Sequence, residues 1–315
     1  RLANTNGGVL SKTMKSLVNT QKKGVDKKLL FYIVFMALPI IQFCVFYIGV
    51  NFQSIMMAFQ RYDSLTGVFS FLNEDLFANF KQIFENPKQL GMMFGNTLIA
   101  WFFSSFVGTF VAVLFSLYIF KRKKVGRFFK FVLFIPSILP GILLSSVFQN
   151  FVNELIPLLF HTNKLLDLVK TPVETQFIVV LVYSIWIGFG TQVLMYTGAM
   201  EQINPAVLEA GKIDGASPWQ EFVHIILPSI MPTVGTFIVA GVALAFVNQI
   251  NLYNFFGGSA QPEVQTIGYY MFKLTREGVN NKTNYPFLSA FGLMCTVVAI
   301  VPTFLLRKYF AKFED

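Results

Sequence analysis

The chain has 315 residues, enough for two ordinary soluble domains, but its composition excludes that organisation. Hydrophobic residues make up 54% of it and charged residues only 13%, about half the charged share of soluble domains. We therefore predict an integral membrane protein. The net charge of +9 fits either a nucleic-acid ligand or the Lys/Arg bias that orients membrane proteins, and the position of the charges decides between the two.

Six apolar runs without a charged residue are each long enough to cross the hydrocarbon core of a bilayer, about 30 Å thick, as a helix. Backbone polar groups cannot stay unpaired in lipid, so runs of this length predict helices. The fold class that we expect is all-α, with six transmembrane helices, the third of them kinked at Pro136 and Pro140. The runs cover residues 29–50, 91–120, 131–150, 177–200, 229–248 and 287–306.

The positive charges are unequally divided between the two sides that six spans define. One side, formed by residues 1–28, 121–130, 201–228 and 307–315, carries 17 Lys/Arg and 7 Asp/Glu, whereas the other carries 8 and 9. Because Lys and Arg are enriched on the cytoplasmic side of membranes, we predict a cytoplasmic N-terminal tail (1–28) and C-terminal end (307–315) around a membrane domain at 29–306. The same distribution argues against a nucleic-acid partner.

The remaining polar signals are few. In the first loop on the opposite side, Asn73 is predicted to cap a helix that runs to about Glu85, with an apolar stripe that packs on the spans or the membrane surface. Cys44 and Cys295 lie in apolar runs and are expected to be buried small hydrophobes. The two histidines lack the spacing of a metal site, so we expect no metal.

The loop between the fourth and fifth runs is unusually rich in helix signals. Asn204, followed by a proline, is predicted to cap a first short helix, which Gly215 ends. Ser217 and Gln220 form the sequence pattern of a capping box and predict a second short helix, which runs to Pro228, where the next span is expected to begin. The result is a helix-turn-helix elbow with small residues around its bend, where another surface can approach closely.

This loop resembles the EAA loop of the membrane subunits of binding-protein-dependent ABC importers. Gly211 departs from the pattern, in which alanine is usual, and costs the first helix about 1 kcal/mol of propensity. Four other stretches, "NFKQIFENP", "NTLIAW", "FKFVLFIPSILP" and "GGSAQP", are similar to the carbohydrate-type permeases of this superfamily, specifically to the first of the two permease subunits. The loop positions that we expect to couple to an ATPase are Glu209, Ala210, Gly211, Asp214, Gly215, Ala216, Phe222, Leu227 and Pro228.

The resemblance implies a subunit of the bacterial plasma membrane that moves a sugar or oligosaccharide by alternating access. It implies three partners: a second homologous permease, a cytoplasmic ABC ATPase dimer on which the loop docks, and an extracellular solute-binding protein. Because the resemblance is to one member of a heteromeric pair, we prefer a different chain as the partner permease over a second copy of this one. An amino-acid or peptide substrate remains an alternative to a sugar. Within the loop, Glu209 is expected to brace the first helix through Lys212, and Asp214 could accept backbone N–H groups at the turn.

An energy source is missing from the chain itself. The P-loop pattern is absent, and no charged residue or histidine lies within a span to act in catalysis or proton relay, so we expect no enzyme activity and no cofactor on this chain. ATP and Mg²⁺ would be bound by the partner ATPase. The alternative function is an ion-coupled secondary transporter or a channel, although such carriers usually hold ionisable residues or broken-helix pairs at mid-membrane.

A candidate substrate path lies at the end of the fifth run. Gly241, Ala245 and Asn248 fall on one face of the expected helix, where they serve either helix packing or the lining of the passage. Asn251 and Tyr253, just beyond, could continue the path, because an amide pairs with sugar hydroxyls and an aromatic face stacks on a sugar ring.

Overall fold

The computed structural model describes residues 27–278 and 282–313, and its internal contacts divide the chain into two units, residues 1–56 and 57–315. Most of the predicted tail (1–26) and the last two residues lie outside the described part. From Lys27 onward, the first unit is one continuous helix, formed by α2 (Lys27–Gln42), the π-helical η1 (Phe43–Gly49) and the start of α3 (Val50–Met57). Cys44, expected to be buried, is exposed on it, because a single helix has no interior.

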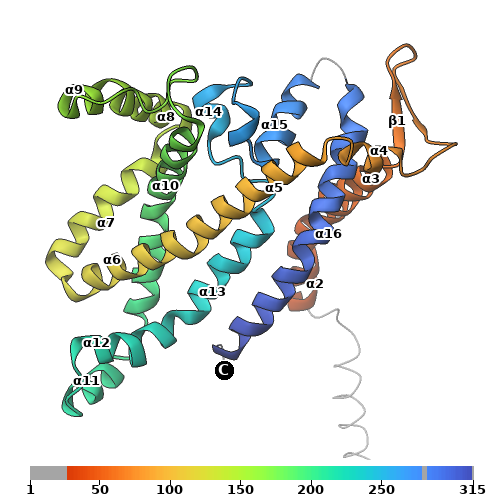
Figure 1. Ribbon diagram of the computed structural model, residues 1–315. Helices are drawn as coiled ribbons and strands as arrows, with labels where there is room; N and C mark the ends of the chain where they lie inside the picture. The colour runs from red at the N-terminus through yellow and green to blue at the C-terminus, as the bar shows by residue number, and fades with distance from the viewer. Residues whose placement is uncertain (1–26, 279–281, 314–315) are drawn as a thin grey trace, which may run out of the picture. The chain divides into compact units, whose positions relative to one another are not determined.

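The second unit contains the other helices and a small hairpin (Figure 1). Before the elbow it has β1 (Gln60–Asp63), β2 (Val68–Phe71), α4 (Ala78–Ile83), α5 (Pro87–Phe102), η2 (Phe103–Gly108), α6 (Thr109–Lys121), α7 (Lys123–Ile138), α8 (Gly141–Asn150), η3 (Phe151–Leu155), α9 (Ile156–Phe160) and α10 (Val173–Glu201). It continues with α11 (Pro205–Ile213), α12 (Pro218–Glu221), η4 (Phe222–Ile226), α13 (Leu227–Leu244), α14 (Leu252–Phe256), η5 (Pro262–Val264), α15 (Ile267–Glu277), η6 (Lys282–Asn284), α16 (Tyr285–Phe310) and η7 (Ala311–Phe313).

Six helices of the described residues are long and apolar enough to cross a membrane, which confirms the predicted number. Each predicted run overlaps such a helix, but the runs 131–150 and 229–248 do not coincide with theirs, and several helices extend past the apolar runs. They cover Lys28–Met57, Pro87–Lys121, Gly141–Phe160, Val173–Glu201, Pro218–Leu244 and Lys282–Phe313. The protein is therefore a multi-pass integral membrane protein of mostly helical fold.

The third predicted span, 131–150, is wrong as a single helix. The chain breaks at Leu139, which has an extended backbone with φ −79° and ψ 145° and ends α7, and α8 begins after Pro140. Proline lacks an N–H and crowds the residue before it out of the helical region, so a break falls at this point. Pro136, by contrast, is accommodated inside α7.

The fifth span also differs at both ends from the predicted 229–248. The second elbow helix does not stop at Pro228 but continues through η4 into α13, so elbow and span form one helix. In η4 the N–H of Leu227 bonds to the carbonyl of Phe222, a wider turn than the α-helical one. This wider turn explains how Pro228 fits, since in a regular α-helix its ring would meet the carbonyl four residues earlier. The helix then ends at Leu244.

The loop after the first helix contains structure that was not predicted. Strands β1 and β2 pair antiparallel, with Gln60 opposite Phe71. The helix expected to run from Asn73 to about Glu85 is only the short α4. Asp75, not Asn73, accepts a backbone N–H just before it, that of Phe77. The Asp75 carboxylate accepts bonds from Lys81 Nζ (2.7 Å) and from a backbone N–H, which lowers its pKa. This hairpin is a small departure from an all-α fold.

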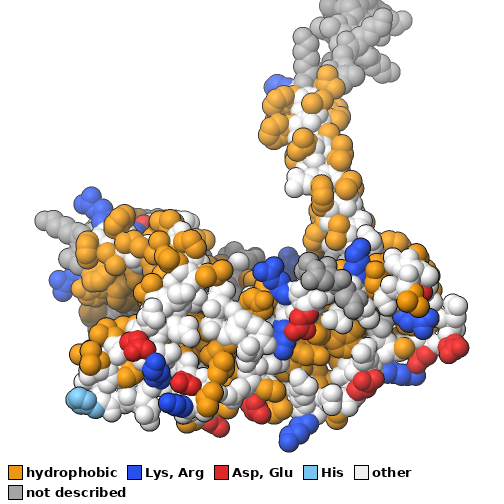
Figure 2. Space-filling model, turned by 90° about the horizontal axis from the view of Figure 1, so that it is seen from above, with side chains coloured by type: hydrophobic (Ala, Val, Ile, Leu, Met, Phe, Trp, Pro, Cys, Tyr) orange, Lys and Arg blue, Asp and Glu red, His pale blue; other side chains and the backbone are white. Residues whose placement is uncertain are grey.

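The two ends of the second unit differ in character. The elbow of α11 and α12 lies at one end, where α16 also terminates, and α8, α9, α14 and α15 gather at the other (Figure 1). Seen from above, onto that other end, side chains of both charge signs are interspersed among apolar and polar ones (Figure 2).

A hydrophobic cluster anchors the base of the elbow to the spans. It joins side chains of α6, α10, η4, α13 and α16, so the elbow packs on several spanning helices at once. Its buried members are Ala112, Val113, Ile119, Val193, Tyr196, Met200, Phe222, Ile226, Ile230, Val234, Ile238 and Phe310.

Candidate functional site

The elbow, which we define as residues 204–228, has the predicted local structure. Asn204 Oδ1 accepts the N–H of Ala206 at 3.0 Å and so caps α11. At α12 the capping box is complete: Ser217 Oγ accepts the N–H of Gln220 at 3.3 Å, and Gln220 Oε1 accepts the N–H of Ser217 at 2.8 Å. These bonds satisfy amides that a helix start leaves open, so both helices are defined by local interactions.

Two glycines shape the bend of the elbow. Gly215 has φ +79°, in the left-handed region that a residue with a β-carbon rarely adopts, and nothing lies within 4 Å of the position of such a carbon. Gly211 faces inward, where an added β-carbon would lie 2.6 Å from Ile225 Cδ1. The departure from the usual alanine therefore coincides with a close approach of Ile225 to the first elbow helix.

The opposite face of α11 is exposed. Val207, Ala210 and Asp214 follow one another at the spacing of a single helix face, and all three are exposed. Ile213 beside them is 86% exposed, and Trp219 of α12 is 65% exposed. Large apolar side chains at such exposure were not singled out from the sequence, since no periodic signal separates a docking residue from a packing residue in so short a helix.

Two acidic side chains of the elbow, Glu209 and Asp214, are without partners in the described part of the chain. No ion pair joins Glu209 to Lys212, so the expected bracing is absent, and no backbone N–H donates to the Asp214 side chain. Both carboxylates are exposed. They are therefore free to contact another molecule.

Other predicted elbow residues divide between surface and interior. Ala210 and Pro228 are exposed, and Ala216 and Leu227 are half-buried. Phe222 is buried in the cluster at the base of the elbow. Its position makes it a packing residue that connects the elbow to the spans.

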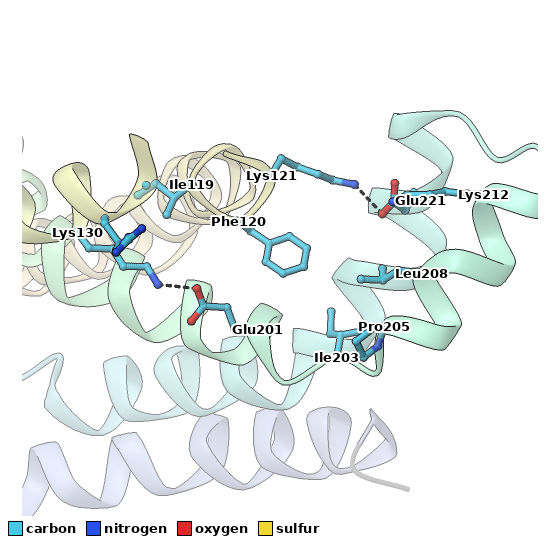
Figure 3. Close-up of a pocket in the computed structure, with 12 residues that line it drawn as sticks. Ile119, Phe120, Lys121, Lys130, Glu201, Ile203, Pro205, Leu208, Lys212 and Glu221 are labelled. Carbon is cyan, nitrogen blue, oxygen red and sulfur yellow. Dashed lines mark hydrogen bonds and ion pairs between the residues drawn. The ribbon is translucent and has the colours of Figure 1, made fainter. Parts of the chain in front are cut away.

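Two ion pairs connect the elbow region to neighbouring spans (Figure 3). Lys121, the last residue of α6, places Nζ 2.6 Å from Oε1 of Glu221, the last residue of α12. The Glu221 side chain is only 6% exposed and that of Lys121 36%. Lys130 of α7 pairs at 2.7 Å with Glu201, which ends α10. The sequence analysis did not single out these four residues, because their partners are distant along the chain.

The candidate substrate-path residues are not arranged as one helix face. Gly241 lies in α13 against the second span, where an added β-carbon would be 2.7 Å from Ser105 Oγ and 3.5 Å from Trp101 Nε1. Its small size thus permits close helix packing. Ala245 is the C-cap of α13 and keeps a helical backbone, whereas Asn248 lies beyond the helix end, although its N–H still bonds to the carbonyl of Leu244 at 2.9 Å.

The segment after α13 is a turn built by its own amides. Asn248 Oδ1 accepts the N–H of Ile250 at 2.8 Å, while the residue itself is exposed. Asn251 adopts φ +61°, a left-handed conformation that asparagine tolerates, and its Oδ1 accepts a bond from Asn254. Tyr253 packs edge-on against Phe272 with ring centroids 4.9 Å apart. These contacts leave the Asn248 amide nitrogen free.

No group of three or more His, Cys, Asp or Glu side chains placed to hold a metal ion occurs among residues 27–278 and 282–313.

Six candidate spans among the described residues, one of them continuous with a capped elbow, define a multi-pass membrane protein. The chain matches the binding-protein-dependent transport system inner membrane component family over residues 104–313, two thirds of its length, and it belongs to that family. It is 25% identical to the sn-glycerol-3-phosphate transport system permease protein UgpA of Pectobacterium atrosepticum over 204 residues, 64% of this chain and 68% of that protein.

A second relative covers more of the chain. The multiple sugar-binding transport system permease protein MsmF of Streptococcus mutans is 22% identical over 288 residues, 89% of this chain and 95% of that protein. In fold, the chain is similar to a chain of a bacterial ABC transporter involved in the import of the acidic polysaccharide alginate, with a TM-score of 0.74, 20% identity, and 94% and 100% of the two chains covered. The protein is thus a permease component with the fold of ABC importers.

Proposed function

We propose that this chain is one permease subunit of an ATP-driven importer and that its elbow is the docking surface for a cytoplasmic ATPase. The observation that carries the proposal is the exposed surface of the elbow: Val207, Ile213 and Trp219 expose apolar side chains there, and the carboxylates of Glu209 and Asp214 are exposed and unpaired. Exposed apolar patches with polar rims are typical of interaction sites. A rigid helix that continues from this face into the fifth span would carry a displacement of the ATPase into the membrane.

The proposed assembly contains three kinds of partner: an ABC ATPase dimer that binds ATP and Mg²⁺, a second permease subunit and an extracellular solute-binding protein. The family description includes dependence on a binding protein. A similar solved transporter was determined in complex with an alginate pentasaccharide-bound periplasmic protein. We prefer a second, different permease as the partner, because the sequence resembles the first subunit of a heteromeric pair.

The proposed substrate is a sugar or oligosaccharide. The names of two relatives refer to sugar or to a phosphorylated polyol, and the transporter of similar fold imports a polysaccharide. An ion-coupled transporter or a channel would instead work without ATP. The two mechanisms are separated by measuring uptake of labelled oligosaccharide into proteoliposomes that hold the complete complex. ATP or a non-hydrolysable analogue is supplied at the ATPase side. Uptake that is equal under both conditions refutes ATP-driven import.

The proposed orientation places the elbow and both chain ends in the cytoplasm. We expect a cysteine at Ser217 to react with a membrane-impermeant maleimide only after permeabilisation, and one at Ser259, an exposed position at the opposite end, to react in intact cells. Both native cysteines, Cys44 and Cys295, are replaced in the parent protein, so that the introduced cysteine is the only thiol in its sequence. The reverse labelling pattern would put the elbow out of reach of any cytoplasmic ATPase.

Asn248 is the residue that best tests the proposed substrate path. We expect Asn248→Asp, which keeps the Oδ1 acceptor of the turn but removes the amide donor, to retain expression and reduce uptake up to about tenfold, the loss of one hydrogen bond of about 0.5–1.5 kcal/mol. Asn248→Ala should lower uptake and expression together, because it also removes the turn bond. Wild-type uptake in the Asp variant would eliminate Asn248 from the path.

A further inference from the structure

A groove of about 650 Å³ separates the inner face of the elbow from the neighbouring spans (Figure 3). Its walls come from the terminal residues of two candidate spans, Lys121 and Glu201, and from the first turns of α7. Gly126 allows α7 to begin close to α6, since an added β-carbon would lie 2.8 Å from the carbonyl oxygen of Ile119. A groove at the ends of spanning helices lies where lipid headgroups meet water.

The chemistry of the groove is amphipathic. Its apolar part is formed by five side chains, and the Phe120 ring projects into the space between α6 and the elbow (Figure 3). Its charged part contains four cations and two carboxylates. The apolar residues are Ile119, Phe120, Ile203, Pro205 and Leu208, and the charged residues are Lys121, Arg127, Lys130, Lys212, Glu201 and Glu221.

Two of the four cations have no counter-ion. Both carboxylates are already engaged, Glu221 by Lys121 at 2.6 Å and Glu201 by Lys130 at 2.7 Å. Arg127 and Lys212, one from each side of the groove, have no partner in the described part of the chain, and both are exposed. The groove therefore has an excess of two positive charges above an apolar floor.

We propose that this groove binds the phosphate headgroup of an anionic phospholipid, with Arg127 and Lys212 as the headgroup ligands and the apolar floor covered by the start of an acyl chain. Charge complementarity favours this occupant, because basic pockets at membrane surfaces attract anionic lipids. The opposite face of α11 stays available to the ATPase when a lipid is bound: Pro205, Leu208 and Lys212 line the groove, whereas Val207, Ala210 and Asp214 lie on the opposite face. A bound lipid would hold the elbow against the ends of the second and fourth spans and the start of α7.

Native mass spectrometry of the assembled transporter in detergent tests the proposal. The complex is titrated with phosphatidylglycerol, with phosphatidylcholine of the same acyl chains, and with glycerol phosphate. We expect wild type to retain phosphatidylglycerol in preference to phosphatidylcholine, and the double variant Arg127→Gln/Lys212→Gln to bind it roughly 30-fold more weakly at this site. The matched control is Arg307→Gln/Lys308→Gln. It removes two exposed charges near the C-terminus of α16, at the end of the unit that holds the elbow, and should bind phosphatidylglycerol as wild type does.

Three outcomes would overturn the lipid assignment. Equal retention of the two lipids would show that charge has no role, and unchanged phosphatidylglycerol binding in the Arg127/Lys212 double variant would place the lipid elsewhere. If glycerol phosphate binds as tightly as the lipid, the apolar floor contributes nothing to affinity and the occupant is a free phosphate compound. If the double variant instead loses the ATPase subunit while its lipid binding is unchanged, the occupant is an acidic protein surface. Because lipid retention is read without ATP hydrolysis, the result is independent of the proposed transport function.

Discussion

Replacement of Gly215 by leucine is expected to weaken association with the ATPase about tenfold and to leave membrane insertion intact. The left-handed backbone at this position costs a residue with a β-carbon roughly 1–2 kcal/mol, so leucine disfavours the bent conformation that binds, and a loss of 1.4 kcal/mol corresponds to a factor of ten in the apparent binding constant. The leucine side chain would also project from the bend into open space, where nothing of the described chain lies within 4 Å. It would therefore obstruct the docked partner rather than the elbow itself.

The measurement is co-purification of the ATPase together with substrate-stimulated ATP hydrolysis. Gly215→Asn is the matched variant, because asparagine tolerates the left-handed region and is small, and it should retain most of both. Gly257→Leu introduces greater strain, at φ +55° and ψ −132°, at the opposite end of the unit and should leave ATPase association unchanged in the protein that inserts. If Gly215→Leu associates and hydrolyses ATP normally, the elbow is not the coupling element.

Lys121→Met is expected to destabilise the protein more than any other single charge removal in the elbow region. It leaves the Glu221 carboxylate, 6% exposed, without its counter-ion, and breaking a buried pair from one side typically costs about 3–5 kcal/mol. The lower end applies here, since Lys121 itself is 36% exposed. A lower midpoint of thermal aggregation of the purified complex, by several degrees, is the expected result.

The asymmetry of the pair provides the controls. Glu221→Gln should cost less, because the lysine left behind can reach water. The double variant Lys121→Met/Glu221→Met should recover much of the loss, since no buried charge remains. Lys130→Met breaks a more exposed pair, with Glu201 56% exposed, and should change stability by at most about 1 kcal/mol. Equal destabilisation by Lys121→Met and Lys130→Met would contradict the burial argument.

Local and compositional features of the molecule could be predicted from its sequence. The number of spans follows from the lengths of uncharged apolar runs, because lipid requires every backbone group to be paired within the segment. The caps at Asn204 and Ser217 and the turn at Gly215 were predictable for a similar reason: each bond or backbone angle involves residues at most three positions apart. Such interactions depend little on the rest of the fold.

Only the tertiary structure decided which distant residues meet. Lys121 and Glu221 are paired because α6 and η4 pack in one hydrophobic cluster, and no local pattern identifies either partner. The same holds for Gly241, whose small size is explained by Ser105 of another helix. Asn248 was assigned to a helix that ends before it, where its side chain closes a turn instead. Contacts between distant segments depend on how whole helices pack, and periodicity within one segment carries no information about the surface on the other side of the contact.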